Sequence, residues 1–521
     1  MFLKRTRVRS GKNTHTYLQL VQAYREGGRP RQRVVATLGR EDQIDPAQID
    51  RLVASLAPYG SRKRVGDADV SLLPGRAFGH VWALEHLWRE LRLDRILEDL
   101  ARPRFARFSL PDVVEAIVFG RVVRPSSDRA LVREWLEGVE APRFAGIQLH
   151  QVYRALRFLA EVQGELQRRL ALVLTQQLFA DVSLVLFDTS SVYFEGMGPE
   201  LAERGYSRDH RPDRPQVNLG LLTSREGYPL AHWLFEGNRS DVGAFAEASR
   251  TFRDLLPAGS FVVVADRGVV SRENLENLQA EGIPYIVGER LRRKLAREAL
   301  ARGGRYRKAA EGLQVKEIRR EGSERVLVCF SAEQAERDRQ ERERIVERLQ
   351  EKLQDAGWRS LLPPSARRYV DLEASEPRID WAKVREDARY DGKWVLRTTS
   401  TLSPEEVALS YRGLWRMERA FRTMKTPLEI RPVYHWSEDG VRGHVQSCVL
   451  AYLLVRLIED RLQRAGLEPN ARVALEKLAQ IQRIPLEVAD RTVVKTTRLS
   501  EEHRRILQAL RVPEPAEVQV A

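Results

Sequence analysis

Two short apolar runs, at 184–187 and 261–265, each end directly in an aspartate, Asp188 and Asp266. Apolar runs of this length, bounded by polar residues, are typical of buried strands. Around them lie three further segments with the pattern of strands and two with the pattern of helices: 216–222, 230–235 and 284–287 for the strands, 244–256 and the stretch that begins near 271 for the helices. The region therefore predicts a mixed α/β layer of three strands, a helix, a strand, a helix and a strand.

The positions of the two aspartates indicate a function for them. A carboxylate at the end of a buried strand lies where α/β sheets often place functional groups. If the two strands are neighbours, Asp188 and Asp266 come within reach of one divalent cation. Mg²⁺ binds proteins through one or two carboxylates together with substrate phosphates. The alternative is that each aspartate only caps the loop that follows it.

A third group of residues lies on a helix predicted from 403 to about 425. Residues seven positions apart on a helix differ by only ~20° around its axis, so Tyr411, Glu418 and Lys425 share one face, with Arg422 beside Glu418. A single glutamate that faces inward among cations can complete a metal site, and the cations can hold phosphates. The alternative is a weak surface pair between Glu418 and Arg422, four residues apart, which leaves the aligned tyrosine and lysine unexplained.

Charge and cysteine content narrow the functional classes. The chain has 521 residues, with 87 Lys+Arg against 73 Asp+Glu and a formal net charge of +14, and such a surplus favours nucleic acid as a partner. Its two cysteines, Cys329 and Cys448, exclude a disulfide framework, a Cys-rich zinc module and an iron–sulfur cluster. The apolar run at 449–455 is too short to span a bilayer, and the first residues lack the apolar segment of a signal peptide. We therefore expect a soluble, intracellular protein with no membrane partner.

The first 40 residues are strongly basic, with ten Lys or Arg residues and one acid, Glu26. The stretch 16–24 partly alternates like a strand, 25–29 reads as a turn, and 33–38 predicts a return strand. We therefore expect a basic β-hairpin module at 1–45 that contacts DNA. The alternative is a solvated arm without a partner.

The rest of the chain predicts five regions: a helical DNA-binding or dimerisation region at 46–180, the first part of the α/β core at 181–289, an insertion at 290–400, the final helices of the core at 401–465, and a C-terminal helical tail at 466–521. Within the insertion, 315–330 predicts two strands and 332–354 a charge-dense helix with a solvated face. Ser403 and Glu406 form the capping box that opens the helix carrying Tyr411.

Together these residues resemble the DDE transposases of bacterial insertion sequences, in the group whose third motif reads Tyr-x2-Arg-x3-Glu-x6-Lys. The tyrosine, glutamate and lysine of this motif match at the right spacing, as Tyr411, Glu418 and Lys425. Leu414 stands where the motif has arginine, so Arg412 or Arg416 is the alternative source of a phosphate contact. The segments 187–191 and 264–268 match the motifs of the first and second aspartate, and 205–213, 237–238, 285–288 and 391–397 add further matches. The resemblance covers residues 1 to about 510.

The resemblance implies an α/β fold: an RNase H-like mixed-sheet catalytic core, interrupted by a β-rich insertion and preceded by the basic β-hairpin module and the helical domain. It implies that Asp188, Asp266 and Glu418 are the catalytic residues and bind two Mg²⁺ ions, or Mn²⁺ in their place. The expected DNA contacts come from the hydroxyl and positively charged groups of Tyr411, Arg422, Lys425 and Arg267.

The implied function is a cut-and-paste DNA transposase. Metal-dependent cleavage at the transposon ends frees a 3′-OH, which is then joined to target DNA in the same site. The implied partners are terminal inverted repeats, target DNA and a second copy in a homodimer on paired ends, in the bacterial cytoplasm and associated with the nucleoid. Two alternatives are an inactive transposase-derived DNA-binding protein, against which the three acids argue, and a metal-dependent RNase H-like nuclease, which would need neither the basic hairpin nor strand transfer.

Other candidate residues have weaker support. His210 and Asp213 lie near Asp209 on a polar loop and could be metal ligands, but the motif needs neither, so we expect DNA contact or a plain loop. The sequence has neither a Gly-x-x-x-x-Gly-Lys phosphate loop nor the glycines of a serine nucleophile elbow. These features disfavour an ATP-driven transposition helper and a serine recombinase.

Overall fold

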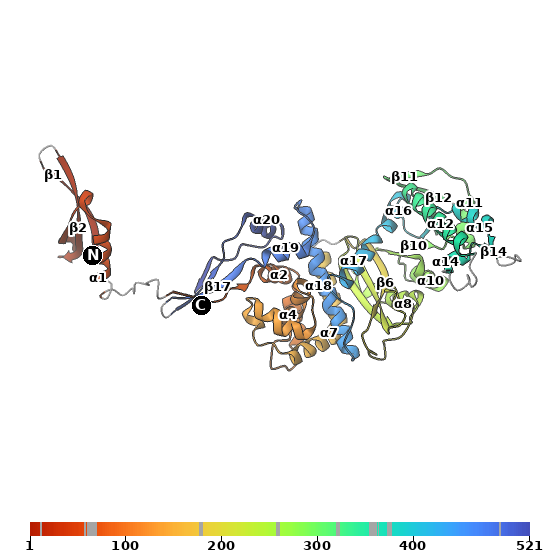
Figure 1. The fold of residues 1–521 in the computed structure, drawn as a ribbon, viewed down its shortest axis with the longest axis horizontal. Coiled ribbons are helices and arrows are strands. Elements are labelled where there is room, and N and C mark those ends of the chain that lie inside the picture. Colours follow the sequence, from red (N-terminus) through yellow and green to blue (C-terminus); the bar gives the residue numbers. More distant parts are fainter. Residues whose placement is uncertain are drawn as a thin grey trace. The chain divides into compact units, whose positions relative to one another are not determined.

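The computed structural model describes residues 1–10, 13–56, 59, 70–176, 181–256, 261–318, 324–353, 362, 364–371, 378–488 and 491–520. The chain forms two compact units (Figure 1). The smaller comprises Met1–Gly75, Ile484–Lys495 and Val518–Ala521, and the larger comprises Arg76–Arg483 and Thr496–Glu517.

The smaller unit begins with a three-stranded antiparallel sheet in the order β1 (Phe2–Ser10), β2 (Asn13–Glu26) and β3 (Arg29–Arg40), followed by η1 (Glu41–Gln43) and α1 (Pro46–Leu56). The predicted hairpin at 16–38 lies within β2 and β3. The first strand, β1, was not predicted, because its alternating arginines hide the apolar periodicity on which strand prediction depends. The same unit contains β4 (Val70–Leu72), which pairs with the second half of β17 (Gln482–Val488), and β18 (Arg491–Thr496), which pairs with β19 (Val518–Val520).

Most arginines of the N-terminal sheet lie on one of its faces. Paired residues of neighbouring antiparallel strands point to the same face, as do alternate residues along a strand. Each of these arginines is paired with an even-numbered residue of β2: Arg5 with Leu18, Arg7 with Thr16, Arg9 with Thr14, Arg29 with Glu26, Arg31 with Tyr24 and Arg33 with Gln22. All six are exposed, and we call this surface the arginine face. The opposite face has Lys4, Arg25 and Arg40, of which Arg40 is paired with Asp42 at 2.6 Å.

The larger unit has a helical layer and a sheet. The helical layer consists of α2 (Gly79–Glu90), α3 (Leu93–Ala101), α4 (Leu110–Val123), α5 (Asp128–Ala130), η4 (Leu131–Trp135), α6 (Leu136–Gly138), η5 (Pro142–Phe144), α7 (Leu149–Gln176), α18 (Glu438–Arg464), α19 (Ala471–Leu478) and α20 (Glu501–Ala509). The central helix α4 is buried along most of its length and packs against α7 and α18, which lie side by side (Figure 1). The helices α2 to α7 of this layer lie in the region 46–180 that was predicted to be helical, and α18, α19 and α20 come from outside that region.

Among the described residues, one helix, α18, is long and apolar enough to cross a membrane by its length and composition. However, 89% of its apolar window is buried inside the structure, as in the core helix of a globular protein.

The sheet has nine strands in the order β8 (Pro229–Glu236), β7 (Gln216–Ser224), β6 (Leu184–Tyr193), β9 (Val262–Ala265), β10 (Tyr285–Glu289), β16 (Lys393–Thr398), β13 (Arg325–Phe330), β12 (Leu313–Ile318) and β11 (Arg307–Ala310). Strand β9 is parallel to both β6 and β10, and all other pairs are antiparallel. The large mixed sheet confirms the predicted α/β class and the predicted succession of elements between 181 and 289.

The two faces of the sheet are covered by different helices. On one face, Phe187 of β6 packs against Phe245 of α8 (Asp241–Ser249) and Phe252 of α9 (Phe252–Leu255), with ring centroids 5.2 and 6.1 Å apart. On the other face, the hydroxyl of Thr223 in β7 donates to the sulfur of Met417 in α17 (Trp415–Lys425) at 3.2 Å. Thr223 pairs with Leu186, so α17 lies on the face to which even-numbered residues of β6 point.

The predicted insertion is both helical and β-rich. Most of its strands belong to the nine-stranded sheet, while β14 (Val370–Asp371) and β15 (Arg378–Ile379) pair only with each other among the described residues. Strand β16 pairs with β10, so β11, β12, β13 and β16 extend the same sheet. The remaining elements are α11 (Lys294–Ala301), α12 (Ala332–Lys352), α14 (Pro364–Arg367) and α15 (Trp381–Ala388). The two strands predicted at 315–330 and the charge-dense helix after 332 are present as β12, β13 and α12.

The C-terminal region was predicted wrongly as a helical tail, because β17, β18 and β19 lie among its helices. Strand β17 pairs with residues far away in the sequence: its Gln482 and Arg483 pair with the two residues of β5 (Arg76–Ala77). Because this strand is stabilised by a partner so far away in the sequence, its own residues give little indication of a strand.

The packing of α7 on α18 leads to a stability prediction. A Cβ added at Gly443 of α18 would lie 2.0 Å from the carbonyl oxygen of Leu156 in α7, and backbone cannot move away cheaply. Gly443→Ala should therefore lower the melting temperature, since overpacking costs ~1–3 kcal/mol. Gly164→Ala, within α7 and with no atom within 4 Å of its Cβ, should instead raise stability by ~0.5–1 kcal/mol. Equal melting temperatures for the two variants would contradict this packing.

Candidate active site

Asp188 and Asp266 occupy equivalent positions on neighbouring parallel strands. The pairing of β6 with β9 ends at Phe187 and Ala265, and each aspartate is the next residue along its strand. The condition for bringing the two aspartates together, that their strands are neighbours, is therefore met. One detail differs from the prediction: β6 does not end at Asp188 but continues to Tyr193, because β7 pairs with it over this length.

The surroundings of Asp188 favour a positive charge near it. The backbone N–H of Thr189 donates to its Oδ1 at 2.8 Å. Burial raises the pKa of Asp188 to about 7, and the carboxylates of Asp266 and Asp241 act in the same direction, against Arg208. A cation placed between these groups relieves both the burial cost and the repulsion.

Tyr411 holds the second aspartate in place. It lies in α16 (Pro404–Arg412), which begins with the predicted capping box, and its hydroxyl donates to Oδ1 of Asp266 at 2.6 Å. Burial, together with the Asp266 carboxylate, raises the pKa of Tyr411, so the phenol stays protonated and remains a donor. A Cβ at Gly288 of β10 would lie 2.3 Å from this hydroxyl, so the glycine makes room for the tyrosine.

Two residues beside Asp188 were missed by sequence reasoning. Oδ1 of Asp241, at the start of α8, accepts from the hydroxyl of Thr189 at 2.8 Å and from the guanidinium of Arg208 at 2.6 Å. The backbone N–H of Arg208 also donates to the hydroxyl of Ser191 at 2.8 Å. An aspartate directly after the N-cap Ser240 is so common at helix starts that its sequence context indicated nothing more.

Glu418 does not contact the two aspartates. It is exposed on α17 and has no hydrogen bond or ion pair among the described residues, so the surface pair with Arg422 is not formed. Within the part of the chain that the structure describes, no three His, Cys, Asp or Glu side chains lie close enough together to hold a metal ion. The helix that carries Glu418, α17, covers the sheet face to which Asp188 points. Asp188 and Leu186 are both even-numbered residues of β6, so their side chains point to this same face.

The single helix predicted from 403 to 425 is two helices, α16 and α17. Between them, Leu414 N–H bonds the Tyr411 carbonyl and Met417 N–H bonds the Leu414 carbonyl, three residues apart instead of four. This tighter turn changes the angle between successive residues, so the common face inferred for Tyr411, Glu418 and Lys425 does not hold as a simple helix face. Leu414 packs against the main hydrophobic core, which explains a leucine at the motif's arginine position.

The predicted cations lie in different surroundings. Lys425 is nearly buried, and its Nζ bonds Oδ1 of Asp209 at 2.9 Å, a carboxylate that also lies 3.1 Å from Arg431. Arg422 and Arg267 are exposed. Of the two alternatives for the missing motif arginine, Arg412 and Arg416, both line a separate cavity of 200 Å³ beside Leu184 and Leu186.

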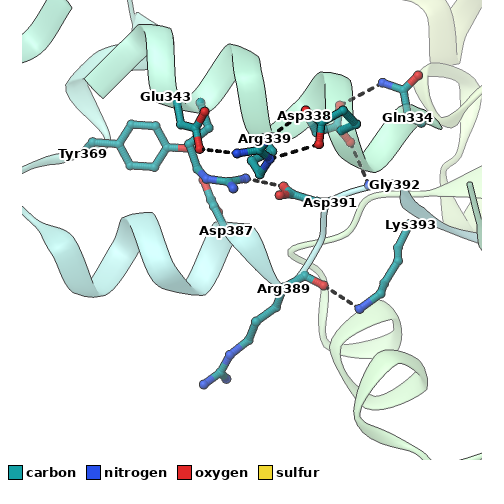
Figure 2. Close-up of polar contacts among 12 residues, drawn as sticks. Gln334, Asp338, Arg339, Glu343, Tyr369, Asp387, Arg389, Asp391, Gly392 and Lys393 are labelled. Carbon is teal, nitrogen blue, oxygen red and sulfur yellow. Dashed lines mark hydrogen bonds and ion pairs between the residues drawn. The ribbon is translucent and has the colours of Figure 1, made fainter. Parts of the chain in front are cut away.

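A larger cavity of 840 Å³ adjoins the second aspartate. It is lined by Asp266, Arg267 and Tyr411 on one side and by α12 and α15 of the insertion on the other. Figure 2 shows part of the insertion wall, where Asp338 of α12 accepts from Gln334 at 2.8 Å and from the backbone N–H of Gly392 at 2.9 Å. The bond from Gly392 holds α12 against the loop before β16, so the wall has a defined shape.

The polar loop at 205–213 does not form a metal site among the described residues. Asp213 is exposed and paired with Arg211 at 2.9 Å and Arg214 at 3.4 Å. His210 has a positive φ of 56° at a turn and no carboxylate or thiol partner among the described residues. The side chain of Asp209 is buried and bonds Lys425.

Comparison with known proteins identifies the family. The transposase DDE domain family matches residues 180–454, more than half of the chain. The chain belongs to the DDE transposase family. The N-terminal domain family of IS1634 transposases matches residues 3–68, so the protein is an insertion-sequence transposase, an enzyme that cleaves DNA and transfers strands. No curated protein sequence matches the chain significantly.

A solved structure with a similar chain is the synaptic complex of the piggyBac transposase with hairpin DNA. The two chains are 8% identical with a TM-score of 0.39, and the match covers 77% of this transposase and 79% of that chain.

Membership of this family implies that the transposase depends on a divalent metal ion. The carboxylates of Asp188 and Asp266 fit such an ion, because they are hard oxygen ligands at adjacent positions on two strands. Burial, and after it the carboxylates of Asp266 and Asp241, raises the pKa of Asp188, so a nearby cation would stabilise its charged form.

The contact between Tyr411 and Asp266 can be tested by two different substitutions. Tyr411→Phe removes the donor, and Gly288→Ala pushes the hydroxyl away. Loss of a group that orients a metal ligand typically costs ~10–100-fold in activity or metal affinity, so both variants should cleave the transposon end more slowly and need more metal. Gly303→Ala, whose Cβ has no atom within 4 Å, is the matched control and should behave as the wild type. Normal metal dependence in Tyr411→Phe would show that the hydroxyl does not position Asp266.

Proposed function

We propose that this transposase works by a cut-and-paste DDE mechanism in which Asp188, Asp266 and Glu418 are the catalytic, metal-binding residues of an RNase H-like core. The observation that carries the proposal is the position of Asp188 and Asp266, side by side at the point where the parallel strands β6 and β9 stop pairing. The strand order β8–β7–β6–β9–β10 supports it, because three antiparallel strands followed by two parallel ones are the order of an RNase H-like core.

The residues around the two aspartates have distinct roles in this proposal. A divalent ion, with two Mg²⁺ or Mn²⁺ ions as the proposed complement, supplies Lewis acidity toward the attacking and leaving oxygens. Tyr411 keeps Asp266 oriented, and Lys425, held by Asp209, contributes positive charge next to the scissile strand. The exposed side chains of Arg267 and Arg422 contact backbone phosphates. Glu418 is exposed and unpaired among the described residues, so its side chain is available to turn toward Asp188 when metal and DNA bind.

The proposed partners follow from the same mechanism. The DNA substrates are the terminal inverted repeats and the target, and a homodimer holds the paired ends in the bacterial cytoplasm, near the nucleoid. In this proposal, the module at 1–45 and the helical region at 46–180 bind DNA or the second subunit. The insertion at 290–400 forms a wall of the cavity beside Asp266. The arginine face is the proposed DNA-contact surface of the N-terminal module, since it holds six exposed arginines and one acid, Glu26.

The triad is tested by substitutions that keep volume and remove charge. Asp188→Asn, Asp266→Asn and Glu418→Gln should each abolish end cleavage while DNA binding, measured by fluorescence anisotropy, stays close to that of the wild type. Arg419→Ala, next to Glu418 but paired with Glu459 of α18 at 2.9 Å, is the control and should retain cleavage. Cleavage at the wild-type rate by any of the three acid variants would remove that residue from the active site.

The arginine face is tested by comparing the two faces of one sheet. If Arg7 and Arg9 contact phosphates, Arg7→Ala combined with Arg9→Ala should reduce the slope of log K against log [salt] by about two units, at ~0.9 per contact. The control combines Lys4→Ala with Arg25→Ala, which removes the same charge from the opposite face and should leave most of the slope intact. Equal changes of the slope in both double variants would mean that DNA does not bind preferentially to the arginine face.

A further inference from the structure

A large groove in the helical layer carries three exposed aromatic side chains. Its volume is 1080 Å³, and it lies between the segment 121–129, the first turns of α7 and the segment 429–444 that leads into α18. Tyr153 is 50% exposed, Tyr434 66% and Trp436 87%. These rings contribute little to the core, and a tryptophan exposed to this extent in a concave surface indicates a binding site.

Arginines are spaced between these rings. The groove is lined by four arginines and three acids: Arg121, Arg129, Arg157 and Arg431, with Asp128, Glu429 and Asp439. One of the acids is compensated, because Asp439 lies 3.4 Å from Arg157. Asp128 lies 3.7 Å from His435, whose pKa is lowered by burial. Arg129 is exposed and has no hydrogen bond or ion pair among the described residues. The groove therefore offers aromatic faces together with available positive charge.

This combination fits a nucleic-acid strand better than a protein surface. The centres of protein interfaces are depleted of charged residues, whereas seven charged side chains line this groove. Single strands bind where bases stack on aromatic rings and arginines follow the backbone. The volume exceeds the ~300–1,000 Å³ typical of pockets for one small ligand, so the groove has room for more than one nucleotide.

One wall of the groove contacts the residues around the active site. Arg431 lies 3.1 Å from Asp209, the carboxylate that also bonds Lys425. The backbone N–H of Val433 donates to the carbonyl of Tyr193, the last residue of the strand that carries Asp188. From Asp188 to this point is five residues of extended chain, roughly 17 Å, which is the length of a few nucleotides.

We propose that this aromatic groove binds a short unpaired stretch of DNA next to the cleavage site, with bases stacked on Trp436, Tyr434 and Tyr153 and phosphates held by Arg129, Arg157 and Arg431. The inference rests on the enzyme's activity as a DNA transposase. It adds a site for single-stranded DNA in the helical layer, outside the carboxylate site and the arginine face.

The test measures binding of single-stranded and duplex DNA by the full chain. Divalent metal ions are left out of the assay, so that DNA is not cleaved, and the probes are a fluorescein-labelled single strand of about 12 nucleotides and the duplex of the same sequence. Trp436→Ala should weaken single-strand binding by about 5- to 150-fold with little effect on the duplex, and Trp436→Phe should restore most of it. Trp381→Ala, which removes another half-exposed tryptophan outside the groove, is the control and should change neither affinity.

Three results would overturn the proposal. The first is unchanged single-strand affinity in Trp436→Ala, and the second is an equal loss for both probes. The third is a loss of self-association on a sizing column without a loss of single-strand binding, which would make the groove a contact between subunits. Because the readout is binding and not cleavage, an error in the assigned catalytic triad would leave the result unaffected, and the two proposals fail separately.

Discussion

The parallel pairing of β6 with β9 is the constraint on which the catalytic part of this transposase depends. Both strands are buried on both faces, so their register is determined by packing over the whole sheet and not by the aspartates. Since the pairing stops at Phe187 and Ala265, the two following carboxylates are placed next to each other. A shift of one residue in either strand would turn one of the acids to the other face. The free energy gained by burying the apolar strands thus offsets the repulsion between the two carboxylates.

Hydrogen-bond donors and a nearby arginine compensate part of the negative charge of these carboxylates. Tyr411 donates to Asp266, Thr189 donates to Asp188, and Arg208 lies near enough to Asp188 to oppose the rise of its pKa. Gly288 is required because a side chain there would occupy the place of the Tyr411 hydroxyl. In our proposal, these contacts hold the two carboxylates in position before a metal ion binds, which reduces the reorganisation needed during catalysis.

DNA contacts are distributed over surfaces of different character in our proposal. The arginine face is flat, regular and rich in exposed charge, which suits the uniform phosphate spacing of a duplex. The aromatic groove is concave and nearly balanced in charge, which suits bases that have left the helix stack. Different salt dependence is expected for the two, because most of the affinity of the arginine face would come from released counterions and much of the affinity of the groove from stacking.

The sequence by itself determined the α/β class, the succession of elements between 181 and 289, the hairpin of the N-terminal module and the two aspartates, because these depend on local periodicity and on residue spacing. It did not reveal β1 or the strands of the C-terminal region, whose arginine-rich sequence or distant partners leave no local pattern. Only the tertiary structure showed that Tyr411 bonds Asp266, that Lys425 bonds Asp209, and that Asp241 and Arg208 stand beside Asp188. It also showed that the third motif lies on two helices, α16 and α17, and that Glu418 does not contact the aspartates. Contacts between residues far apart in the chain are decided by packing of whole elements, and no property of a single segment contains that information.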